Sequence, residues 1–172
     1  MDQLMSDFSP PRVSTSFEKK VGASLCMASE LAMSDKLPKF RLVSAPTGGS
    51  KTTSSIALLA MLANENKGFT GAYICKTIEE CEYVYRQLKR LVDPSVLAVY
   101  TSLHKHEASP TKLLEKKKEH GLEIHDHFDS MDLPKSRLII TTHCRWKKEY
   151  EDEIDLGVRK YKGNQRNLII ID

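Results

Sequence analysis

The sequence lacks long apolar runs and a strong excess of charge of either sign, and each absence excludes a class of protein. Its longest apolar run covers residues 56–63, far fewer than the roughly 20 residues of a membrane-spanning helix. The N-terminus has no basic segment followed by an apolar core, so no secretory signal is visible, and we expect a cytoplasmic protein. The net charge of +3 excludes a chain that is polybasic throughout, so any nucleic-acid surface must be local.

Cysteine pairs with metal-binding spacing are also absent. The sequence holds four cysteines, and no two of them are separated by two residues: Cys26, Cys75, Cys81 and Cys144. Two of the four lie in or beside apolar runs. This pattern favours reduced, partly buried thiols over a disulfide framework or a zinc site.

What the sequence does contain is an alternation of short apolar runs and helical patterns. Runs rich in Val, Ile and Leu without polar alternation predict strands buried on both faces, at residues 71–75, 96–100, 137–142 and 167–172. Helical spacing predicts helices at residues 17–33 and 52–66, the second closed by Gly68, and a third that begins at the capping box of Thr77 and Glu80.

A further apolar run at residues 40–43 precedes the second helix and is expected to be the first of five strands. Interleaved strands and helices indicate right-handed crossovers in a mainly parallel sheet, and thus an α/β fold of three layers. We expect a loose lead-in at residues 1–16 and one domain at residues 17–172.

The predicted domain contains a polar surface insertion at residues 103–135, with a highly charged helix. Its lysine run is expected to be a solvated face, with an accessory nucleic-acid contact as the alternative. A metal site for zinc or nickel is an alternative there, because Asp126 lies among five histidines, but the spacings of these histidines fit no standard site: His104, His106, His120, His125 and His127.

The most informative stretch begins where the first apolar run ends. Small residues separate that run from a helical pattern that opens with Lys51 and Thr52, which is the strand, loop and helix context of a phosphate-binding loop. Backbone N–H groups at a helix start can hold phosphates closely only where side chains are small. The lysine would reach the β- and γ-phosphates, and the threonine hydroxyl would ligand Mg²⁺. The predicted cradle comprises Ala45, Pro46, Thr47, Gly48, Gly49, Ser50, Lys51 and Thr52.

Ser50 departs from this pattern, because its Cβ stands where a glycine is normally used. Either the backbone at Ser50 tolerates the side chain or the affinity for nucleotide suffers. A chance turn of glycine and serine before a helix is the alternative interpretation of the whole stretch.

The last predicted strand ends in Asp172. P-loop enzymes use a carboxylate at a strand end to hold the magnesium ion, because strand C-termini lie beside the phosphate loop. Together with Lys51, Asp172 is therefore a candidate catalytic residue, and with Thr52 it is a candidate magnesium ligand.

With these motifs, the chain resembles the N-terminal RecA-like lobe of a superfamily 2 helicase of the DEAD/DEAH type. Residues 45–52 resemble motif I of that family in its A-x-x-G-x-G-K-[ST] form, and residues 169–172 resemble the start of motif II. The resemblance extends over residues 38–172, and no glutamine motif precedes it. It implies a RecA-like P-loop fold, with ATP and Mg²⁺ as cofactors.

The resemblance also implies contacts with the backbone of DNA or RNA. The positions that correspond to motif Ia and to the threonine-rich segment after the fourth strand are Lys76, Thr77, Thr141, Thr142 and His143. The sequence ends before the glutamate that follows the aspartate of motif II, so the fold is expected to be incomplete at its C-terminus. A second RecA-like lobe is expected in the full-length protein, and the 172-residue chain is expected to bind ATP without hydrolysing it alone.

Two alternatives remain open at this stage. The chain could be the ATPase domain of a viral terminase-like packaging motor, which shares the loop and the acidic strand end. It could also be a non-catalytic nucleotide-binding or interaction module in which Ser50 marks decay of the site. No Asn-Lys-x-Asp guanine signature is present.

Overall fold

The structure is a computed structural model that describes residues 15–34, 42–44, 50–102, 111, 115, 118, 136–152 and 157–172. The helices are α2 (Ser16–Ser34), α3 (Lys51–Glu65), α4 (Ile78–Leu91), the 3₁₀ helix η1 (Pro94–Val96) and α6 (His143–Glu151). The strands are β1 (Gly71–Cys75), β2 (Leu97–Tyr100), β3 (Leu138–Thr142), β4 (Lys160–Tyr161), β5 (Asn164–Gln165) and β6 (Leu168–Ile171).

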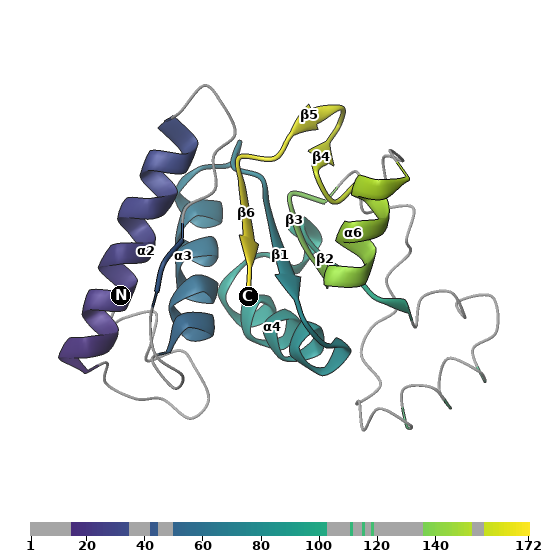
Figure 1. Cartoon of the computed structure of the whole chain (residues 1–172), viewed down its shortest axis with the longest axis horizontal. Coiled ribbons are helices and arrows are strands. Elements are labelled where there is room, and N and C mark those ends of the chain that lie inside the picture. Colours follow the sequence, from purple (N-terminus) through teal and green to yellow (C-terminus); the bar gives the residue numbers. More distant parts are fainter. Residues whose placement is uncertain are drawn as a thin grey trace.

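Four strands form a parallel sheet in the order β2-β3-β1-β6, and β4 and β5 form a separate antiparallel hairpin. The connection from β1 to β2 contains α4 and crosses over the position of β3 in the sheet. The connection from β3 to β6 contains α6 and crosses over the position of β1. Figure 1 shows α2 and α3 to one side of the sheet and α6 near its other side. The prediction of an α/β fold with a mainly parallel sheet is confirmed.

The two faces of the sheet bury different apolar sets, as the strand period of two requires. On one face, Tyr73 and Cys75 of β1 pack in the cluster that includes α3 and α4. On the other face, Ala72 and Ile74 pack with Val158 and Trp146. The sheet is therefore covered on both faces, which explains why its strands are continuous apolar runs.

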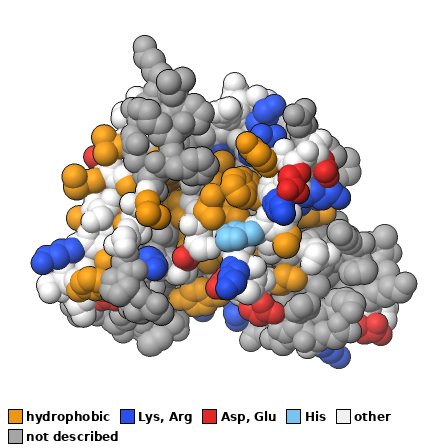
Figure 2. Space-filling view, viewed as in Figure 1, with side chains coloured by type: hydrophobic (Ala, Val, Ile, Leu, Met, Phe, Trp, Pro, Cys, Tyr) orange, Lys and Arg blue, Asp and Glu red, His pale blue; other side chains and the backbone are white. Residues whose placement is uncertain are grey.

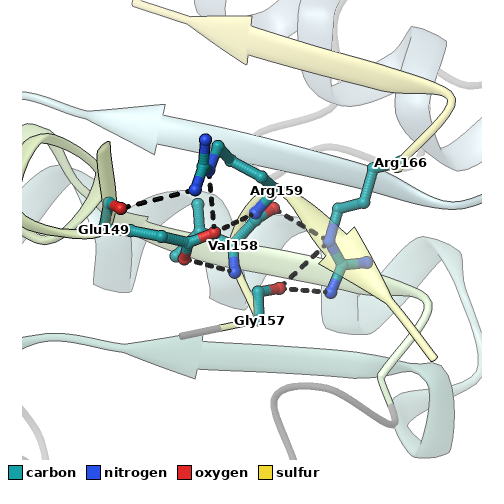
Figure 3. Close-up of polar contacts among 5 residues, drawn as sticks. All are labelled: Glu149, Gly157, Val158, Arg159 and Arg166. Carbon is teal, nitrogen blue, oxygen red and sulfur yellow. Dashed lines mark hydrogen bonds and ion pairs between the residues drawn. The ribbon is translucent and has the colours of Figure 1, made fainter. Parts of the chain in front are cut away.

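A polar network fixes the turn that precedes the hairpin (Figure 3). The carboxylate of Glu149, fully buried on α6, accepts hydrogen bonds from the backbone N–H groups of Val158 and Arg159 and from Arg159 Nε. The guanidinium of Arg166 donates to the carbonyl oxygens of Gly157 and Val158 from the other side. Because Arg166 lies just before β6, this network anchors the beginning of the strand that Asp172 follows.

The sheet differs from expectation in its number of strands. Residues 42–43 are the described part of the predicted first strand, and they belong to no strand. Leu42 is 95% exposed, which a strand buried on both faces would not allow. The described sheet therefore has four strands rather than five.

The cap of α3 also differs from expectation. The helix ends at Glu65, and the N–H of its C-cap residue, Asn66, donates to the carbonyl of Leu62. Gly68 was expected to close the helix, but among the described residues only Gly157 and Gly163 are glycines with positive φ. The side chain of Asn66 instead accepts a hydrogen bond from the N–H of Gly68.

The prediction of free, partly buried thiols is confirmed. All four thiols are free, and Cys75 and Cys81 are buried whereas Cys144 is exposed. A hydrogen bond with Cys75, together with burial, raises the pKa of the Cys81 thiol, so this thiol stays protonated and unreactive near neutral pH.

Exposed apolar side chains occur on α2, where Phe17, Met27 and Leu31 are each more than two-fifths exposed. Figure 2 shows apolar side chains scattered over that part of the surface. None of the helices in the described ranges has the length and hydropathy to cross a membrane.

Candidate functional site

The carboxyl ends of the parallel strands bring several predicted site residues to one edge of the sheet. Cys75 pairs with Thr142 in register, and Ile74 pairs with Ile171. The residues that follow these positions therefore emerge side by side. Asp172 is fixed there by its own N–H, which donates to the carbonyl of Ile74 at 3.0 Å.

At this edge, two hydroxyl groups converge on one carboxylate oxygen. Thr52 Oγ1 donates to Asp172 Oδ2 at 2.6 Å, and Tyr73 Oη donates to the same oxygen at 2.7 Å. Thr52 lies in the first turn of α3, and Tyr73 lies in β1. Two predicted magnesium ligands, 120 residues apart in the sequence, are thus in direct contact.

Tyr73 is a buried tyrosine whose hydroxyl reaches the rim of the site. Its side chain is 1% exposed within the core beneath α3. Burial, and then the negative charge and hydrogen bond of Asp172, raise the pKa of the Tyr73 phenol above its ordinary value. The phenol is therefore a permanent hydrogen-bond donor to the carboxylate.

The beginning of α3 differs from the beginnings of α2 and α4. Its N-cap residue, Ser50, makes no side-chain cap, and no acidic residue stands in the first turn of the helix. The Ser50 hydroxyl donates instead to Glu18 Oε1 of α2. No carboxylate of the first turn therefore competes with an anion for the backbone N–H groups there, and the positive end of the helix dipole favours negative charge.

Glu18 is buried, and its other oxygen accepts a hydrogen bond from the N–H of Thr15 at 2.7 Å. The hydroxyl of Thr15 in turn accepts from the N–H of Glu18, which completes a capping box at the start of α2. Glu18 thus links the start of α2 to the start of α3 through Ser50.

The backbone of Ser50 has φ 55° and ψ 28°, which is the left-handed region. This is the physical reason why a glycine would be favoured at this position. Serine is tolerated here with its hydroxyl bound to Glu18.

We expect Ser50→Gly to leave the protein about 1 kcal/mol more stable than Ser50→Ala. Both variants lose the hydroxyl that donates to Glu18, but only alanine keeps a Cβ in the left-handed conformation. Urea unfolding of the two variants measures the difference. Equal stabilities would contradict the conformation described for Ser50.

A capping box already provides hydrogen-bond acceptors for backbone N–H groups at the start of α4. Glu80 Oε2 accepts from the N–H groups of Lys76 and Thr77, and the Thr77 hydroxyl accepts from the N–H of Glu80. The predicted capping box is confirmed. The backbone N–H groups of Lys76 and Thr77 therefore already have a partner, which leaves the Lys76 ammonium as the main group for a phosphate contact.

Thr141, Thr142 and His143 lie at the same edge and differ in accessibility. Thr141 is fully buried, and its hydroxyl donates to the carbonyl of Tyr100 at 2.7 Å, so its side chain is not available to a ligand. Thr142 is the N-cap of α6 without a side-chain cap, and the first turn of α6 has no acidic residue. His143, the first residue of α6, has a buried Nε2 without a hydrogen-bond partner in the described part of the chain.

Two predictions fall on parts of the chain that the structure does not describe. Residues 45–49 of the phosphate cradle lie outside the described residues, as do the five histidines of the insertion. Across the described ranges, no group of three or more His, Cys, Asp or Glu side chains could hold a metal ion.

Sequence reasoning did not find Tyr73 or Glu18 as site residues. Tyr73 lies in an apolar run, and nothing in the sequence distinguishes it from a core residue. Glu18 had a local signal, because Thr15 and Glu18 have the spacing of a capping box. Its contact with Ser50 depends on the packing of α2 against α3.

Comparison of the chain with protein-family models and with curated proteins finds no match in either set. The motifs and the geometry of the site are therefore the features that support a function for this chain.

Proposed function

We propose that this chain is the ATP-binding lobe of a superfamily 2 nucleic-acid helicase or translocase with a RecA-like P-loop fold. The observation that carries the proposal is the 2.6 Å hydrogen bond from Thr52 Oγ1 to Asp172 Oδ2. It joins the first turn of the helix that follows the glycine and serine loop to the residue after β6, an edge strand of the described sheet that pairs with the central strand β1. This pairing is what a magnesium site shared by a phosphate loop and a strand-end aspartate requires.

The donor chemistry fits a magnesium ion bound with a nucleotide. A hydroxyl has one proton and two lone pairs, so Thr52 can donate to Asp172 and still offer a lone pair to the metal. Mg²⁺ prefers oxygen ligands and is usually held by one or two carboxylates plus phosphates and water. The bound ion would neutralise phosphate charge, and Thr52 and Asp172 would orient it.

In the proposed complex, Lys51 contributes a positive charge at the start of α3 to the β- and γ-phosphates. Backbone N–H groups of the loop, which every residue of 45–50 except Pro46 carries, would contact the phosphates. The direct test is titration with a fluorescent ATP analogue in the presence of Mg²⁺, for which we expect saturable binding that unlabelled ATP competes. Absence of saturable binding would refute the nucleotide assignment and favour a non-catalytic interaction module.

DNA or RNA would lie across the same edge of the sheet, mainly through its phosphates. The groups best placed for this are the Lys76 side chain and the beginning of α6 at Thr142 and His143. A helix start without an acidic residue can accept a phosphate from a nucleic-acid backbone. A second RecA-like lobe in the full-length protein would complete the nucleic-acid and nucleotide contacts.

We expect binding of single-stranded nucleic acid by this chain to be weak and dependent on salt. The proposed contacts are limited to the Lys76 side chain and the beginning of α6, and charges of both signs are interspersed among the described residues on the face in Figure 2. With about three contacts, the affinity should fall roughly 20-fold between about 50 and 200 mM salt. Fluorescence anisotropy at several salt concentrations measures the slope.

A matched pair of variants sharpens this test. Lys76→Ala should make the affinity for nucleic acid less dependent on salt. Lys67→Ala removes an exposed charge beyond the C-terminal end of α3, away from the proposed contacts, and should leave the salt dependence unchanged. Tight, sequence-specific and salt-insensitive binding would contradict the proposed mode of contact.

A further inference from the structure

The site contains a hydroxyl group that the phosphate-loop pattern does not call for. Tyr73 Oη lies 2.7 Å from Asp172 Oδ2, beside the 2.6 Å bond from Thr52. Both donors bind the same carboxylate oxygen. In the described part of the chain, Oδ1 of Asp172 accepts no hydrogen bond.

The two donors are held with different rigidity. Thr52 is half-buried in the first turn of α3, next to the loop that would contact phosphates. The Tyr73 ring is 1% exposed in the central strand, which has neighbours on both sides. The core therefore fixes the position of Tyr73 Oη, since a close-packed ring cannot turn away without displacing its neighbours.

We propose that Tyr73 is a positioning residue that orients the Asp172 carboxylate toward the magnesium ion of the bound nucleotide. This inference rests on the proposed nucleotide-binding function. Tyr73 and Thr52 hold Oδ2 on the protein side, which turns Oδ1 toward the ligand. Groups that hydrogen-bond to metal-binding side chains commonly change metal affinity by 10- to 100-fold when they are removed.

The geometry also explains why a tyrosine stands in the central strand. A phenylalanine would fill the same volume in the core beneath α3, so packing alone does not require the hydroxyl. A buried hydroxyl needs a partner, and Asp172 is that partner. The Asp172 carboxylate thus satisfies the hydrogen-bonding requirement of the buried Tyr73 hydroxyl.

The test is Tyr73→Phe, which removes Oη and retains the ring. Binding of a fluorescent ATP analogue is measured against Mg²⁺ concentration and in excess EDTA. We expect the Mg²⁺ concentration for half-maximal effect to rise about tenfold, with unchanged binding in EDTA. Tyr100→Phe is the control, because it removes a hydroxyl from a buried strand tyrosine that packs on the opposite face of the sheet.

A double-mutant cycle with Asp172→Asn separates positioning from a general loss of structure. If Tyr73 acts through Asp172, Tyr73→Phe should have no further effect on the Mg²⁺ requirement in the Asp172→Asn background. The inference is overturned by an undiminished effect there, or by an unchanged Mg²⁺ requirement in a folded Tyr73→Phe protein. Wild-type protein that binds no analogue at any Mg²⁺ concentration would overturn the proposed function and this inference together.

Discussion

Replacing Lys51 with alanine is expected to abolish binding of ATP at concentrations that saturate the wild-type protein. Lys51 is the first residue of α3, and no acidic side chain stands in the first turn of that helix. Apart from the proposed magnesium ion, the other contributions to phosphate binding are backbone dipoles, so the substitution removes the positive charge that Lys51 would bring to the phosphates. Charge-assisted hydrogen bonds contribute about 1.5–3 kcal/mol each, and the loss of one or two corresponds to a reduction in affinity of about 100-fold.

The matched control for this substitution is Lys67→Ala. Lys67 is exposed just beyond the far end of the same helix, so the control loses the same charge from a place where no phosphate is expected. Titration of a fluorescent ATP analogue, with circular dichroism to verify folding, compares the two variants with the wild type. Wild-type affinity in a folded Lys51→Ala protein would remove Lys51 and its loop from the site.

The elements that sequence reasoning predicted well are those whose signals are local. The strands β1 and β6 are continuous apolar runs in the sequence, because both faces of the sheet are covered. The capping box of Thr77 and Glu80 was visible because its two hydrogen bonds join residues three apart. The expectation that Thr52 and Asp172 lie near one site came from the rule that strand C-termini lie beside the phosphate loop, but their direct hydrogen bond was not predicted.

The elements that were missed have weak or non-local signals. The short helix α6 is largely polar, and its one buried residue is Glu149, so it has no apolar stripe to reveal it. The hairpin turns at Lys162 and Gly163, both with positive φ. The sequence signal for such a turn is usually Asn-Gly or Asp-Gly. Because lysine stands in the first position here, that signal is absent from the sequence.

Side-chain contacts between elements distant in the sequence could not be predicted, for a different reason. Tyr73 and Asp172 are 99 residues apart, and the contact depends on the register between β1 and β6. Glu18 and Ser50 meet because α2 packs against α3. Neither packing can be derived from spacing along the sequence.

The largest effect on stability is expected from Arg166→Met. The Arg166 side chain is buried, and its guanidinium donates to carbonyl groups of three separate segments. The first segment is the turn before the hairpin, where the carbonyl oxygens of Gly157 and Val158 accept. The second is the chain before β3, where those of Ser136 and Arg137 accept. The third is the start of β1, where the carbonyl oxygen of Gly71 accepts at 3.5 Å.

Methionine fills a similar apolar volume but donates no hydrogen bond, so several buried carbonyl groups would lose the hydrogen bond from the guanidinium. Each such loss costs about 1–3 kcal/mol, and we expect a total decrease of about 3–5 kcal/mol in the free energy of unfolding. That decrease is a large part of the 5–15 kcal/mol typical of a native protein. Denaturant unfolding followed by circular dichroism measures it.

Two further variants separate the role of the guanidinium from that of its charge. Arg166→Lys keeps the charge but has a single ammonium that cannot span three segments, so it should recover only part of the lost stability. Lys162→Met removes a charge from an exposed position of the same hairpin, and it should change stability by less than about 1 kcal/mol. Because Arg166 anchors the strand that Asp172 follows, Arg166→Met should also weaken the Mg²⁺-dependent binding of nucleotide. Full stability in Arg166→Met would show that the buried carbonyl groups find other partners and that the anchor is dispensable.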